Sequence, residues 1–78
     1  MTSRITILDA RIASLEERIL NFEYAHERLT TLLANAEPTE KPQYEQAIAA
    51  NRATVESLNR KLHDERSKLA RYSVAAFR

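Results

Sequence analysis

The sequence contains no cysteine and no glycine, and only two of its 78 residues are prolines. Without cysteine the chain cannot form a disulfide bond, so its stability has to come from side-chain packing or from association. Without glycine the backbone has few residues that favour a sharp turn or a left-handed conformation. These absences predict a single small domain built of long, regular elements with few turns.

Long apolar runs are also missing, and neither sign of charge dominates. No stretch reaches transmembrane length, and the first ten residues lack the apolar core and cleavage site of a signal peptide. The formal net charge is +1, so a generally basic nucleic-acid binder is not predicted. We expect a complete small cytoplasmic protein with no membrane partner.

Apolar residues recur with a seven-residue period in both halves of the chain. The first half repeats at Ile5, Leu8, Ile12, Leu15, Ile19, Phe22, His26, Leu29, Leu33 and Ala36. The second half repeats at Tyr44, Ile48, Asn51, Val55, Leu58, Leu62, Glu65, Leu69, Tyr72 and Ala76. Alternating steps of three and four residues predict two α-helices that pack along one seam as a left-handed coiled coil.

The segment between the two repeats carries both prolines and predicts a turn. Glu37 precedes Pro38, and a residue in that place is disfavoured in the helical conformation. Thr39 can cap a following helix, and Pro42 falls within the first turn of that helix, where a missing N–H group does no harm. The chain therefore has a natural break here.

A fold-back between residues 38 and 39 aligns the two repeats, because facing core positions then have numbers that add up to 77. Leu15 meets Leu62 and Ile19 meets Leu58, for example. This agreement predicts an all-α fold, an antiparallel two-helix coiled-coil hairpin that forms one domain over residues 1–78. Its parts are a helix at about 3–36, a turn at about 37–40 and a helix at about 40–76. Dimerisation into a four-helix bundle is a further option.

One predicted core layer is polar, because His26 faces Asn51. We interpret the pair as a hydrogen-bonded layer that sets the register, as single polar core residues do in coiled coils. Glu23 and His26 also have the Glu-x-x-His spacing of di-iron helical bundles. The facing helix offers no further carboxylates at that depth, so no metal site is predicted.

The two edges of the seam differ in charge. One edge has attractive pairs such as Asp9 opposite Arg66. The other edge carries a basic stripe, which consists of Arg4, Arg11, Arg18, Lys61 and Lys68. Glu65 occupies a core position beside this stripe and is expected to lean toward Arg11.

The basic stripe has two interpretations. It can be a solvated face that Glu65 partly neutralises, or it can be a docking face for an acidic protein partner. Nucleic acid is the less favoured partner, because no aromatic residue interleaves with the stripe and the opposite edge is acidic.

A few apolar residues lie off the core seam. They are Ile7, Leu20 and Tyr24 on the outer side of the first helix, and Val74 and Phe77 in the last turns of the second helix. Clustered exposed apolar residues often mark interfaces. We expect these residues to contribute to partner binding or self-association, mainly at the open end of the hairpin.

Motifs for catalysis, cofactor binding or metal binding are absent from the sequence, so an enzyme is not predicted. The sequence favours a non-catalytic protein-interaction module, such as an adaptor, an assembly factor or an inhibitor or regulator of a larger protein, that forms a homodimer. The alternative is nucleic-acid binding through the basic stripe.

Overall fold

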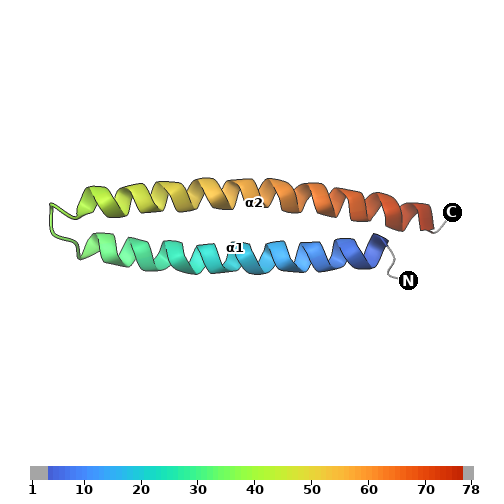
Figure 1. Cartoon of the computed structure of the whole chain (residues 1–78), viewed down its shortest axis with the longest axis horizontal. Helices are drawn as coiled ribbons and strands as arrows, with labels where there is room; N and C mark the ends of the chain where they lie inside the picture. Colours follow the sequence, from blue (N-terminus) through green and yellow to red (C-terminus); the bar gives the residue numbers. More distant parts are fainter. Residues whose placement is uncertain (1–3, 77–78) are drawn as a thin grey trace.

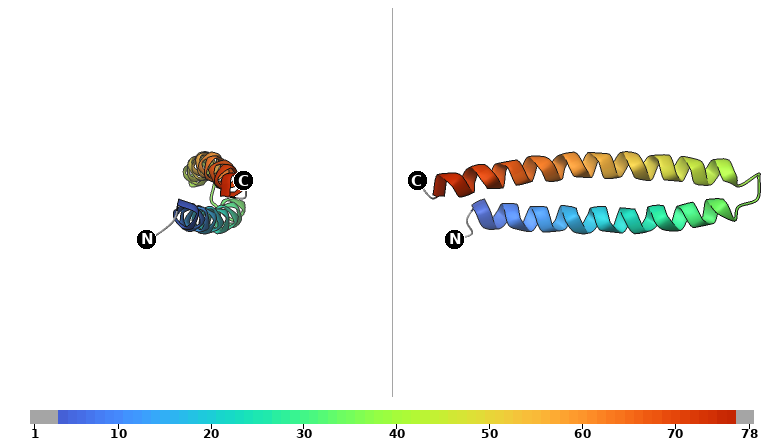
Figure 2. Two further views of the ribbon diagram at one scale, coloured as in Figure 1. Left: turned by 90° about the vertical axis from the view of Figure 1, so that its right-hand side faces the viewer. Right: turned by 180° about the vertical axis from the view of Figure 1, so that it is seen from behind.

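The computed structural model describes residues 4–76, with side chains as far as Val74. Helix α1 spans Arg4–Ala34 and helix α2 spans Lys41–Ala76, and the two run antiparallel as a hairpin (Figure 1). The molecule measures 61 × 18 × 15 Å. The structure confirms the predicted all-α two-helix hairpin. Seen end-on, both helices curve along their length (Figure 2).

Within residues 4–76, no helix combines the length and the apolar character that a membrane crossing requires.

The connection between the helices is slightly longer than the sequence suggested, because α1 ends at Ala34. The N–H groups of Asn35 and Ala36 donate to carbonyls three residues back, at 3.3 and 3.2 Å, which tightens the last turn. The Asn35 side chain donates to the carbonyl of Thr31 at 3.0 Å. Pro38 then excludes helical backbone at the residue before it.

The start of α2 is set by Glu40 and not by Thr39. The Glu40 carbonyl accepts hydrogen bonds from the N–H groups of Gln43 and Tyr44, at 3.1 and 3.4 Å. Pro42 lies in this first turn, where backbone N–H groups have no partner within the helix, so its missing donor costs nothing.

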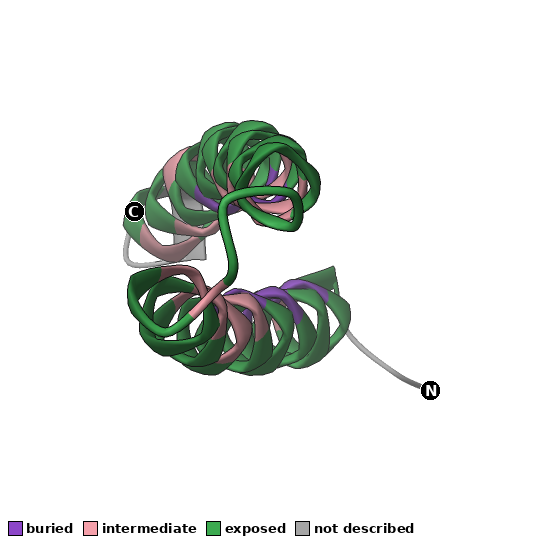
Figure 3. Ribbon diagram, turned by 90° about the vertical axis from the view of Figure 1, so that its left-hand side faces the viewer, coloured by how far each residue is buried: buried purple, intermediate pink, exposed green. Residues whose placement is uncertain are grey.

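The core runs along the seam, but its packing differs between the two ends of the hairpin. The buried apolar side chains all lie in the half farther from the turn, and they are Leu8, Ile12, Leu15, Ile19, Leu58 and Leu62. Nearer the turn, the predicted core residues are only partly buried, and they are Phe22, Leu29, Leu33, Tyr44, Ile48 and Val55. Figure 3 shows that burial is confined to the surfaces where α1 and α2 face each other.

The residues that flank the seam differ between the two halves. In the open half, one edge of the seam holds long side chains such as Arg11, Arg18 and Lys61, whose methylene stems can cover apolar neighbours. In the half near the turn, the same edge holds the uncharged residues Ala25, Leu32, Ala47 and Thr54. The heptad repeat predicts which residues face the seam, but it does not predict how deeply each one is buried.

Candidate functional site

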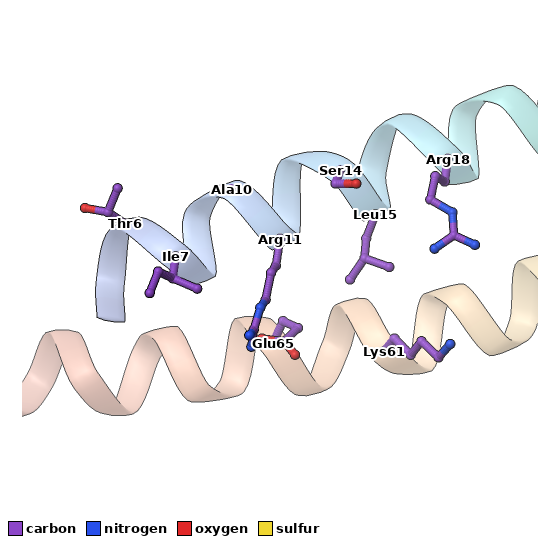
Figure 4. Close-up of a pocket in the computed structure, with 9 residues that line it drawn as sticks. All are labelled: Thr6, Ile7, Ala10, Arg11, Ser14, Leu15, Arg18, Lys61 and Glu65. Atoms are coloured by element: carbon purple, nitrogen blue, oxygen red, sulfur yellow. Dashed lines mark ion pairs between the residues drawn. The ribbon is translucent and has the colours of Figure 1, made fainter. Parts of the chain in front are cut away.

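An open groove runs along one edge of the hairpin, where α1 and α2 meet in the open half. Its main part has a volume of about 590 Å³. The residues that line it are Thr6, Ile7, Ala10, Arg11, Ser14, Leu15, Arg18, Lys61 and Glu65 (Figure 4). Two smaller hollows of about 310 and 300 Å³ continue it toward the helix ends, through the shared residues Arg11, Lys68 and Tyr72. We call this continuous surface the basic groove.

The seven-residue period places the cations in the basic groove. Arg4, Arg11 and Arg18 follow one another at steps of seven on α1, so they share one side of the helix. Lys61 and Lys68 have the same spacing on α2, and the antiparallel packing brings them to the same edge. The structure thus brings together every member of the predicted basic stripe, and it adds Arg71.

Between the cations, the groove has an apolar floor. Ile7 and Leu15 line its main part, and Leu8 lines the adjoining hollow. The α1 wall carries the small residues Ala10 and Ser14, which leave space that larger side chains would fill. The sequence indicated the charges of this edge, but it did not indicate that small residues would open a groove beside them.

Glu65 neutralises only part of the groove. One carboxylate oxygen lies 4.0 Å from Nη1 of Arg11, and the other lies 3.6 Å from Nζ of Lys68. Its side chain is only 17% exposed, so it sits between two cations that would otherwise repel each other. Glu65 therefore lies beside Arg11 as expected, but at a distance too long for a hydrogen bond, and among the described residues its Oε2 atom has no hydrogen-bond partner. Across the described part of the chain, no carboxylate lies within 4.0 Å of the cationic groups of Arg18 or Lys61.

Replacing Glu65 with glutamine should lower the free energy of unfolding by about 1 kcal/mol, at the upper end for a partly exposed ion pair. The substitution keeps the side-chain shape and leaves Arg11 and Lys68 as like charges. Urea unfolding followed by circular dichroism measures the loss, which should shrink at high salt because added ions screen the repulsion.

Glu16→Gln is the matched control for this substitution. Glu16 pairs with Arg66, but both side chains are at least half exposed, so the loss should be no more than about 0.5 kcal/mol. An equal loss in the two variants would contradict a special role for Glu65 between the two cations.

An aromatic side chain does lie in the basic groove, which the sequence interpretation missed. Tyr72 occupies a core position of the repeat, yet it is 38% exposed and lines the groove. The guanidinium of Arg4 lies 5.8 Å from the centre of its ring and donates a hydrogen bond to its hydroxyl oxygen at 3.4 Å.

The opposite edge holds an ion pair different from the predicted one. Nη2 of Arg66 donates to Oε1 of Glu16 at 3.0 Å, whereas Asp9 was the expected partner. Side chains on a helix lean toward its N-terminus. In this hairpin Arg66 therefore leans toward the turn, where Glu16 is closer, and Asp9 leans away toward the open end. The predicted pairing of Arg66 with Asp9 is wrong for this reason.

The polar layer is present without the predicted hydrogen bond. Asn51 is buried, at 9% exposure, and its Oδ1 atom has no hydrogen-bond partner among the residues that the structure describes. His26 is half-buried and lines a small hollow of about 220 Å³ together with Asn51. The proposed role of this pair in setting the register stays a prediction. Among residues 4–76, no group of three potential metal-ligating side chains comes together.

The apolar candidates do not form one patch. Ile7 lines the basic groove. Leu20 and Tyr24 are exposed but line no part of that groove, because their positions in the repeat lie on the other side of α1. Val74 is exposed near the end of α2. Phe77 lies outside the described residues.

The basic groove thus combines apolar and small side chains with cations, and among the described residues two of these cations, Arg18 and Lys61, have no carboxylate within 4.0 Å. Comparisons of this chain with protein-family models, with curated protein sequences and with solved structures give no match.

Proposed function

We propose that this protein is a non-catalytic interaction module that binds an acidic amphipathic helix of a protein partner in the basic groove. A helix that lies in a groove between two helices is a common mode of peptide recognition. The single observation that supports the proposal is that apolar groove residues lie beside two cations, Arg18 and Lys61, that have no carboxylate partner in the described part of the chain.

The chemistry of the groove defines the partner. Apolar side chains at heptad spacing would contact Ile7, which is 39% exposed, and so would remove its apolar surface from water. Carboxylates beside them would pair with Arg18 and Lys61. Complementary charge of this kind contributes chiefly to the rate and the specificity of association. An adaptor, an assembly factor or a regulator could each work through such a contact.

The test uses a labelled synthetic peptide of about 20 residues, with leucines at heptad spacing flanked by glutamates. Fluorescence anisotropy measures its binding to the full chain. Reversing the two unpaired cations in the double variant R18E/K61E should weaken binding by more than about tenfold, because like charges would then face the glutamates. Binding should also weaken as salt is raised.

The control variant reverses two cations outside the groove, Arg28 and Arg60, in R28E/R60E. It carries the same change in net charge and should bind the peptide like the unchanged chain. Equal losses in the two double variants would show that net charge alone attracts the peptide, and absence of any binding would also overturn the proposal.

Nucleic-acid binding remains the alternative, and the place of Tyr72 in the groove is the observation that favours it. An aromatic ring among cations is typical of single-strand binding surfaces. However, Arg4 already lies over that ring, and the apolar floor offers nothing to phosphates. A labelled single-stranded oligonucleotide in the same assay decides between them. Binding of the oligonucleotide but not of the peptide, with loss in R18E/K61E, would replace the protein partner by a nucleic acid.

A further inference from the structure

The charges of α1 are divided between two sides of the helix. Its arginines at steps of seven lie in the basic groove. Its unpaired carboxylates occupy positions of the repeat on the other side, between exposed apolar residues. We call this surface the acidic face, and it consists of Asp9, Glu17, Leu20, Glu23, Tyr24 and Glu27.

The acidic face has the chemistry that the basic groove requires. Leu20 is 48% exposed and Tyr24 is 61% exposed, and these two residues are one helical turn apart, so they form an apolar contact surface. Glu17, Glu23 and Glu27 lie close to that pair on the same side of the helix. In the described part of the chain, none of these carboxylates is engaged in an ion pair.

We propose that the occupant of the basic groove is the acidic face of a second copy of this chain. Leu20 and Tyr24 of one copy would meet the exposed Ile7 and Ala10 of another, and the glutamates beside them would meet Arg18 and Lys61. This inference rests on the proposed function, because it names the acidic helix that the groove binds. The supporting observation is that a basic surface and an acidic surface lie on one chain. The formal net charge is only +1, so two copies do not strongly repel each other.

The geometry also determines the kind of assembly. The groove and the acidic face lie on different sides of α1, so one copy can use both at once. A contact between two different surfaces is heterologous, so a pair of copies still has one free groove and one free acidic face. Such contacts continue into rings or open chains. This differs from the homodimer expected from the sequence, because the assembly would not stop at two copies.

The test compares two neutralised variants by light scattering and analytical ultracentrifugation at low salt. The groove variant R18Q/K61Q keeps the acidic face, and the face variant E17Q/E23Q keeps the groove. The four altered side chains are exposed, so both variants should retain the helical content of the unchanged chain. We expect the unchanged chain to grow in mass with concentration, and each variant alone to associate more than about tenfold more weakly.

An equal mixture of the two variants gives the decisive result. In the mixture, the face variant supplies the intact groove and the groove variant supplies the intact acidic face. One chain of each should therefore form a complex with twice the 9.0 kDa mass of one chain, and no larger species should form. A mixture that stays monomeric while the unchanged chain assembles would overturn the inference, and so would a two-fold dimer that neither variant weakens.

The outcomes separate the two proposals. An unchanged chain that is monomeric at millimolar concentration and low salt, but that binds the glutamate-rich peptide in the groove, would remove the second copy as occupant and keep the proposed function. Failure of the chain to bind that peptide would remove the proposed function, and the inference with it.

Discussion

Replacing Leu58 with alanine is expected to lower the free energy of unfolding by about 2–5 kcal/mol, the usual range for a buried leucine. Leu58 is the least exposed side chain of the core, at 2%. It packs in one cluster with Ile12, Leu15, Ile19 and Leu62, so alanine would leave a cavity among four apolar neighbours. A small domain without disulfides has on the order of 5 kcal/mol of stability, so the variant should be partly unfolded at physiological temperature.

Urea unfolding followed by far-ultraviolet circular dichroism, at low protein concentration, measures this effect. Leu32→Ala is the matched control, because Leu32 is among the exposed large apolar residues of the same hairpin. Its loss should be no more than about 1 kcal/mol, since Leu32 is 42% exposed and water can fill the space that the substitution leaves. Similar losses at both positions would contradict the concentration of the core in the open half.

Replacing Asn51 with leucine is expected to raise the free energy of unfolding by about 1–3 kcal/mol. The Oδ1 atom of Asn51 is buried without a hydrogen-bond partner, and the substitution removes the cost of desolvating it. The hollow of about 220 Å³ beside Asn51 and His26 gives the larger side chain room. Asn59→Leu is the control, because Asn59 is exposed and a change there should stay within about 0.5 kcal/mol.

A loss of stability in Asn51→Leu would show that Oδ1 is satisfied in solution, for example by an ordered water molecule. The mass of the variant in solution carries separate information. Several coexisting oligomers would support a specifying role for the polar layer, since a buried asparagine can select one oligomeric state. An unchanged, single state would show that the turn alone keeps the two repeats aligned.

The features that the sequence predicted well are those that depend on periodicity alone. The seven-residue repeat and the position of the two prolines are sufficient to place Leu15 and Leu62, or Ile19 and Leu58, in one buried core. The same repeat gathers Arg11, Arg18 and Lys61 on one edge. Each of these results follows from helix geometry, in which residues seven apart lie on the same side.

The features that the sequence did not predict depend on the direction and size of individual side chains. Arg66 reaches Glu16 instead of Asp9 because side chains lean toward the N-terminus of their own helix. Tyr72 occupies a core position of the repeat but is 38% exposed and lies beside Arg4, which the repeat alone does not predict. The groove itself depends on the small size of Ala10 and Ser14, and a pattern that records only whether a residue is apolar or polar does not encode side-chain size.

The uneven core also has a consequence for the order in which the hairpin folds. Leu33 and Tyr44 beside the turn are 11 positions apart, and both are only partly buried. Ile19 and Leu58 are 39 positions apart, and both are buried. Closing the longer loop costs only about 1 kcal/mol more in chain entropy, because this cost grows with the logarithm of loop length. The distant layers are more deeply buried, and we expect the free energy gained from that burial to exceed this difference. The transition state for folding should therefore form in the half remote from the turn, and the residues beside the turn should join last, despite being nearest in sequence.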